Sequence, residues 1–246
     1  QYRKTCKSIK KTHSKNRHRV GVEMINVFVG YDEGEKVAFH VLAESIRKHA
    51  SEPVSITPLS INTIKKHFWR EKVPNQSTEF AFSRFLVPYL SEYKGWSIFM
   101  DCDMLFRDDI AKLWALRDFK YSVMCCQHDY EPKQGVKFRG AKNEKFPKKN
   151  WSSMMLMNNG LCTALTPEYV NSASGLELHQ FKWLPNEHAC GNIPLEWNWL
   201  VGEYEYNNNA KNVHYTLGGP YFNDYKDCDY SKEWMETWRQ TTKIGL

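Results

Sequence analysis

A short apolar run, Trp96–Met100, leads directly into the triplet Asp101-Cys102-Asp103. The run has the length and the aromatic content of a buried β-strand, so the two acids begin where a strand ends. Carboxylates two residues apart point to the same side of an extended backbone. At the carboxyl end of an α/β sheet, that side faces the crevice where ligands bind. The triplet therefore predicts an α/β fold with an acidic pair at its binding edge.

The residues before the triplet predict the start of a parallel sheet. Residues 25–30 form an apolar, β-branched run that ends at a glycine, residues 35–49 have helical spacing of apolar positions, and residues 54–59 resemble a second strand. A strand, a helix and a strand in this order favour a right-handed crossover. Further expected elements are a helix capped by Ser77 or Thr78 with Pro88 near its end, a short helix capped by Asp108, strands within 121–126 and 154–157, and a helix opened by Pro167.

The positive charge of the chain belongs to its first residues. Residues 1–22 carry eight Lys and Arg and no acid, so the formal net charge of +6 becomes −2 for the remainder. We expect residues 1–23 to be a disordered tail and residues 24–246 to form a single domain. A nucleic-acid or anionic-membrane arm is an alternative for the tail, and Met24 is a candidate native start. The acidic balance of the remainder argues against a specific nucleic-acid partner.

Cysteine usage and hydropathy bear on the compartment. The seven cysteines include no Cys-x-x-Cys pair, and the basic tail lacks the apolar centre of a signal peptide. No run reaches the length of a membrane-spanning helix. These features favour reduced thiols and a cytoplasmic protein, with the inner membrane surface as a second location.

Residues 128–150 are rich in lysine and poor in apolar positions, which predicts a long mobile loop. One hypothesis is a lid that closes over a substrate. Another is a surface for an anionic acceptor, and a solvated insertion without a role is the third. Its cations are Lys133, Lys137, Arg139, Lys142, Lys145, Lys148 and Lys149.

The spacing of Asp101 and Asp103 suits a hard divalent cation. Carboxylate oxygens prefer Mg²⁺ or Mn²⁺, and such ions commonly keep positions open for substrate phosphates. A phosphatase of the haloacid-dehalogenase type also uses an acidic pair after a strand. That class usually has Thr or Val where this chain has Leu105. Its acidic pair also tends to lie on the first strand of the fold, whereas the pair in this chain comes after about three candidate strands.

Several blocks of the chain, in the same order, resemble the retaining glycosyltransferases of family 8 and their close relatives. The resemblance covers about residues 25–222 and implies a GT-A fold, in which a mixed, mainly parallel sheet is flanked by helices. The blocks are Val27–Asp32, Ser83–Leu90, Phe99–Phe106, Leu195–Asn198 after Pro194, and Val213–Gly219.

The resemblance implies roles for individual residues. Asp101, Asp103 and His214 would bind Mn²⁺ or Mg²⁺, and Arg84 would contact the donor. Tyr31 and Asp32 would bind the uracil and ribose, Ser152 or Ser153 would stand where the family has an Asn, and Gly218 and Gly219 would let backbone amides approach a phosphate. Glu187, aligned only loosely, would contact the transferred sugar or act as nucleophile or base.

The implied activity is transfer of a sugar from a nucleotide-diphosphate donor, a UDP-sugar above all, to a hydroxyl of a glycan, lipid or small-molecule acceptor, with retention. The chain departs from the family at Gly219-Pro220-Tyr221, where a Lys that grips the diphosphate is missing. Either a cation from residues 133–149 replaces it or the metal carries the charge alone.

Overall fold

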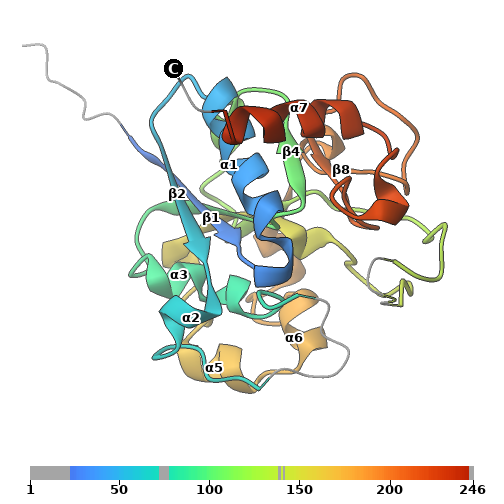
Figure 1. Cartoon of the computed structure of the whole chain (residues 1–246). Helices are drawn as coiled ribbons and strands as arrows, with labels where there is room; N and C mark the ends of the chain where they lie inside the picture. Colours follow the sequence, from blue (N-terminus) through green and yellow to red (C-terminus); the bar gives the residue numbers. More distant parts are fainter. Residues whose placement is uncertain (1–22, 72–77, 138–139, 141, 244–246) are drawn as a thin grey trace, which may run out of the picture.

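The computed structural model describes residues 23–71, 78–137, 140 and 142–243, and its centre is a six-stranded sheet (Figure 1). Five of the six strands run in one direction, and β6 is antiparallel to its neighbours. The predicted mixed, mainly parallel sheet is therefore confirmed. The strands, in spatial order, are β2 (Val54–Leu59), β1 (Ile25–Gly30), β3 (Trp96–Met100), β6 (Met154–Asn158), β5 (Val123–Cys125) and β7 (Cys190–Asn192).

The central strands are buried on both faces. All five residues of β3 are buried, and Val27 of β1 pairs with Ile98 of β3 in the parallel register. Such a strand is a continuous apolar run because both of its faces pack against other elements. β3 ends at Met100, which pairs with Met154 of β6, so Asp101 is the first residue beyond the ladder.

A second, three-stranded sheet continues the chain beyond the acidic pair. Its middle strand is β9 (Asn212–His214), which lies between β4 (Met104–Phe106) and β8 (Trp199–Leu200). β4 and β9 are antiparallel, and Met104 pairs with His214. This pairing brings His214 beside the triplet Asp101-Cys102-Asp103.

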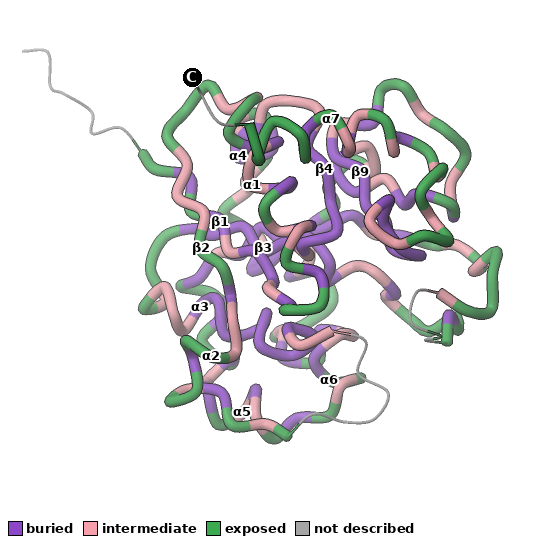
Figure 2. Tube along the Cα trace, viewed as in Figure 1, coloured by how far each residue is buried: buried purple, intermediate pink, exposed green. Residues whose placement is uncertain are grey.

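Helix α1 (Lys36–His49) holds the two sheets together. Leu42 and Ile46 pack into the core of the large sheet, and Val41 packs into the cluster around the small one. The hydroxyl of Ser45 accepts a hydrogen bond from the amide of Phe106 at 3.0 Å. α7 (Ser231–Thr241) packs along α1, and the strands beneath them are buried (Figures 1 and 2).

The remaining helices are short. The α-helices are α2 (Ile61–Ile64), α3 (Val87–Leu90), α4 (Ile110–Trp114), α5 (Pro167–Ser172) and α6 (Gly175–His179). The 3₁₀ helices are η1 (Glu33–Glu35), η2 (Ser83–Leu86), η4 (Trp151–Ser153), η5 (Asn159–Leu161), η6 (Glu187–Ala189), η7 (Leu195–Trp197) and η8 (Asn223–Tyr225).

Two helix predictions need correction. The helix expected after Ser77 or Thr78 is, from Thr78 on, a turn followed by η2 and α3, and Pro88 lies in the first turn of α3. Proline lacks an N–H and is tolerated there, whereas inside one continuous helix it would remove a hydrogen bond. Ser77 itself lies outside the described residues. The cap of α4 is Asp109, whose carboxylate accepts from the amide of Ala111, while Asp108 pairs with Lys112.

The described parts of residues 128–150 run mainly as turns and extended chain, as expected of a loop, but they are anchored. Buried Glu203 accepts hydrogen bonds from the amide of Lys133 and the side chain of Asn143, both at 2.8 Å. The ammonium of Lys149 in turn donates to Asn143. The predicted basic tail lies outside the described residues except for Glu23. Within the described chain, no helix is both long and apolar enough to cross a membrane.

We predict that Gly30→Ala destabilises the fold, because Gly30 ends β1 directly against the ring of Phe80. An added Cβ would lie 2.4 Å from Phe80 Cδ2, and Phe80 is buried. Overpacking of this kind costs about 1–3 kcal/mol. Urea unfolding should show a lower midpoint for Gly30→Ala. Gly135→Ala is the matched control, since its Cβ meets nothing within 4 Å; equal midpoints for the two variants would contradict the packing.

Candidate metal and donor site

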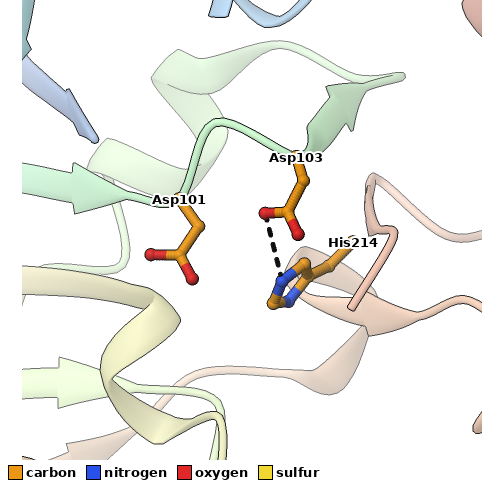
Figure 3. Close-up of side chains that lie close together, drawn as sticks. All are labelled: Asp101, Asp103 and His214. Atoms are coloured by element: carbon orange, nitrogen blue, oxygen red, sulfur yellow. Dashed lines mark ion pairs between the residues drawn. The ribbon is translucent and has the colours of Figure 1, made fainter. Parts of the chain in front are cut away.

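Three side chains from distant parts of the sequence converge at one point (Figure 3). Asp101 follows β3, Asp103 precedes β4, and His214 ends β9. Each offers one ligand atom, and these atoms all lie within 4.8 Å of one another. Two oxygens and one imidazole nitrogen at this spacing can hold a divalent cation such as Mn²⁺.

Backbone pairing on both sides fixes the positions of the two acids. The amide of Asp101 donates to the carbonyl of Ser153 at 2.8 Å, which extends the β3–β6 ladder by one bond. The amide of Tyr215 donates to the carbonyl of Asp103 at 2.9 Å, which extends the β4–β9 ladder. The triplet therefore bridges the two sheets, and its carboxylates are held by main chain that has little freedom.

A buried arginine holds Asp101. Arg84 Nη1 lies 2.8 Å from Asp101 Oδ1 and donates to the carbonyl of Ser152 at 2.9 Å. Its guanidinium also lies over the rings of Phe80 and Phe99, with 5.0 Å to the nearer centroid, that of Phe99. Burial raises the pKa of Asp101 to about 6, and the charge of Arg84 opposes that rise.

The contact between Asp103 and His214 depends on which ring nitrogen of His214 carries the hydrogen. His214 Nε2 lies 3.3 Å from Asp103 Oδ1, and Nδ1 lies 3.0 Å from the side-chain oxygen of Asn198. If Nδ1 carries the hydrogen, Nε2 presents a lone pair to a carboxylate oxygen, and two acceptors face each other. Both groups are almost fully buried, so little solvent screens the two acceptors from each other. A cation between them removes this repulsion, and the donor set therefore fits a metal.

Tyr31 and Asp32 lie where β1 ends, at the same edge of the sheet as Asp101. Asp32 is buried and caps η1, since its carboxylate accepts from the amides of Gly34 and Glu79 at 2.8 and 3.1 Å. Tyr31 packs edge-on against Phe39. The local fold thus explains Asp32 as a cap, and its predicted contact with a nucleoside stays a prediction.

Ser152 and the predicted glycine pair, Gly218 and Gly219, make contacts within the protein. The hydroxyl of Ser152 hydrogen-bonds to His179 of α6 at 2.7 Å, while its carbonyl accepts from Arg84. The amide of Gly218 donates to the carbonyl of Tyr215 at 2.9 Å, so that amide is already used in a turn. Gly218 has φ of 145°, and Cβ atoms at Gly218 and Gly219 would overlap tyrosine rings.

Glu187 is the predicted site residue that the fold does not bring to the cluster. It is exposed, and it precedes β7, which runs in the same direction as β3. Asp101 follows the carboxyl end of β3, so the two residues belong to opposite edges of the sheet. The loose alignment that suggested Glu187 was not supported by a strand position, and we assign this residue no step.

Three further residues approach the cluster without having been predicted individually. Lys137, from the basic loop, is partly buried and interacts electrostatically with both Asp101 and Asp103; burial lowers its pKa and the acids oppose this. Buried His128 follows β5, and burial together with His214 lowers its pKa to about 3, which keeps it neutral. Asn198 contacts His214 directly. For Asn198, the sequence signal was the Trp-Asn block.

Sequence comparison gives one close relative. The chain is 46% identical over 226 residues to Protein CDI of Arabidopsis thaliana, and the match covers 88% of this chain and 87% of the relative. No known protein-family profile matches the chain. The name of this relative specifies no reaction, but the identity and coverage of the match place both proteins in one family.

Structural comparison gives the fold. The bifunctional glycosyltransferase WbbM superposes with a TM-score of 0.63 at 13% identity, over 91% of this chain and 51% of WbbM. The chain thus spans about half the length of WbbM. The glycosyltransferase LgtC superposes with a TM-score of 0.60 at 12% identity, and the match covers 90% of this chain and 98% of LgtC. GlyE of Streptococcus pneumoniae superposes with a TM-score of 0.59 at 10% identity, and the match covers 89% of this chain and 62% of GlyE. The chain belongs to the family of Protein CDI and has the GT-A fold of these glycosyltransferases.

Proposed function

We propose that the protein is a metal-dependent glycosyltransferase that moves a sugar from a nucleotide-diphosphate donor, a UDP-sugar, to a hydroxyl acceptor. The observation that carries the proposal is the cluster of Asp101, Asp103 and His214 at the carboxyl edge of a GT-A sheet. An open α/β sheet binds ligands at this edge. One LgtC structure is described as a complex with donor and acceptor sugar analogues, which supports the same use of the fold here.

The three cluster residues would hold the cation. When bound, a divalent ion supplies Lewis-acid stabilisation of the negative charge that develops on the diphosphate as the glycosidic bond breaks. Arg84 keeps Asp101 ionised and oriented through its ion pair, and its own position is set by the carbonyl of Ser152. We also propose that Arg84 contacts the nucleotide-sugar donor.

Lys137 is our candidate for the diphosphate-binding cation. It would replace the Lys that the resembling family has where this chain has Gly219-Pro220-Tyr221. Its ammonium is attracted by Asp101 and Asp103 and repelled by Arg84, so it lies within electrostatic reach of the proposed diphosphate position. A partly buried ammonium beside the leaving group would stabilise the departing charge. The anchoring of the loop through Glu203 favours a lysine held near the site over a freely moving one.

The reaction proposed is a direct transfer. The acceptor oxygen bonds to the anomeric carbon, the bond from that carbon to the diphosphate oxygen breaks, and the hydroxyl proton passes to the departing diphosphate. This front-face route gives retention, as in the family that the sequence resembles, and needs no protein nucleophile. The acceptor, whether glycan, lipid or small molecule, is left open by the geometry.

The phosphatase alternative has less support from the site. A haloacid-dehalogenase-type enzyme needs its first acid free to attack and its second free to donate a proton. Here Asp101 is ion-paired with Arg84, and Asp103 faces His214 at 3.3 Å. These contacts favour a ligand role for both acids over the roles of nucleophile and general acid.

The first prediction from this proposal concerns nucleotide binding. Uridine diphosphate should bind in the presence of Mn²⁺ and lose most of its affinity when a chelator is added. Asp103→Ala should weaken Mn²⁺-dependent binding by at least ~100-fold, because residues that only support metal ligands already cost ~10–100-fold when removed. Calorimetric titration measures both effects.

Asp227→Ala is the control for that titration, since Asp227 is an exposed acid outside the cluster. It should bind uridine diphosphate like the wild type. Binding that is indifferent to the chelator and to Asp103→Ala would overturn the metal-dependent site.

A separate prediction distinguishes the diphosphate from the nucleoside. Lys137→Ala should weaken uridine diphosphate binding by about 10–100-fold, which corresponds to loss of one charge-assisted hydrogen bond of about 1.5–3 kcal/mol. Uridine itself should bind equally to both proteins. Lys145→Ala serves as the matched loop control, because Lys145 is exposed and paired with Glu131. Equal losses for the two lysine variants would show a general charge effect and contradict a specific role for Lys137.

A further inference from the structure

A chain of polar contacts connects the main chain before β6 to a ring nitrogen of His214, through the buried side chains of Ser153 and Asn198. Ser153 Oγ donates to the carbonyl of Asn150 at 2.7 Å. Asn198 Nδ2 donates to Ser153 Oγ at 2.8 Å, and Asn198 Oδ1 lies 3.0 Å from His214 Nδ1. Ser153, Asn198 and His214 are almost completely buried, with exposed fractions of 2%, 0% and 2%.

The direction of each hydrogen bond follows from the carbonyl at the start of the chain. A carbonyl oxygen only accepts, so the single hydroxyl hydrogen of Ser153 is committed to Asn150. Ser153 Oγ then offers only lone pairs to Asn198, which must turn its NH₂ group toward Ser153. The amide oxygen of Asn198 is left facing His214, and that oxygen again only accepts.

The same reasoning extends to the imidazole. Because Asn198 Oδ1 accepts, the hydrogen of a neutral His214 ring resides on Nδ1. Nε2 is then the unprotonated nitrogen, and it is the nitrogen that faces Asp103 at 3.3 Å. A reversed amide would place NH₂ against Nδ1 and put the hydrogen on Nε2, where it would block a metal ligand.

We propose that Asn198, oriented by Ser153, is the positioning residue that fixes His214 in the tautomer able to bind a metal through Nε2. The inference rests on the metal site of the proposed function and deepens it. Metal-binding histidines commonly donate their second ring hydrogen to an acceptor that sets the ring orientation. Here that acceptor is an amide whose own orientation is set by a carbonyl two hydrogen bonds away.

The first test measures the tautomer directly in the wild-type protein without metal. Long-range ¹H–¹⁵N spectra of the metal-free protein at about pH 8, above the ordinary histidine pKa of about 6.5, report which ring nitrogen carries the hydrogen. The His214 signals are assigned by comparison with His214→Asn. The proposal expects hydrogen on Nδ1 and a pyridine-like Nε2. Hydrogen on Nε2 would overturn it.

The second test removes and then restores the acceptor. Asn198→Ala should lose the tautomer preference and lower the affinity for Mn²⁺, measured alone by calorimetry, by about 10–100-fold. Asn198→Asp retains an acceptor at Nδ1 and should bind Mn²⁺ more tightly than Asn198→Ala. A merely structural role would not be rescued by a buried carboxylate. Equal affinities for the wild type and Asn198→Ala would contradict the proposal.

The outcomes separate this inference from the proposed function. If the wild type binds no Mn²⁺, the metal site itself fails. If the wild type binds Mn²⁺ but carries the hydrogen on Nε2, only the role of Asn198 and Ser153 fails. Should Asn198→Ala not fold, the wild-type spectrum still decides the tautomer.

Discussion

Met104 of β4 pairs with His214 of β9, and this pairing places an imidazole from the last sixth of the chain against an acid from its middle. The same register leaves Asp103 just outside the ladder, held by a hydrogen bond from the amide of Tyr215. A slip of one residue would turn every side chain of β9 to the other face and remove His214 from the cluster. The proposed metal ligands, the proposed tautomer of His214 and the proposed donor position all depend on this register.

The site also concentrates buried charge, which is costly unless it is paired. Arg84 offsets one acid, and Lys137 interacts with both. The contact between Asp103 Oδ1 and His214 Nε2 is unfavourable for the proposed tautomer, in which the hydrogen of His214 is on Nδ1. In our account a cation relieves this contact, so the cluster is arranged to bind an ion. This is a common property of sites that bind charged ligands.

The sequence predicts the parts of the fold that follow from local pattern. The first βαβ unit and the strand before Asp101 appear because their apolar runs are periodic and end at clear signals. The sequence did not distinguish one continuous helix from the turn, η2 and α3 that the structure has, since the apolar positions around Phe85 are compatible with both. The structure separates the two arrangements by placing Pro88 in the first turn of α3. The convergence of Asp101, Asp103 and His214 was expected from the resemblance of the blocks that contain them. Asn198 was not, because its role depends on hydrogen-bond direction across 45 residues to Ser153.

The most direct test of the central claim is anomalous diffraction from crystals soaked with Mn²⁺ and uridine diphosphate. The account predicts one manganese peak among Asp101 Oδ, Asp103 Oδ and His214 Nε2, with diphosphate oxygens completing the coordination. A peak elsewhere, or ordered uridine diphosphate with no manganese at these three residues, would contradict it.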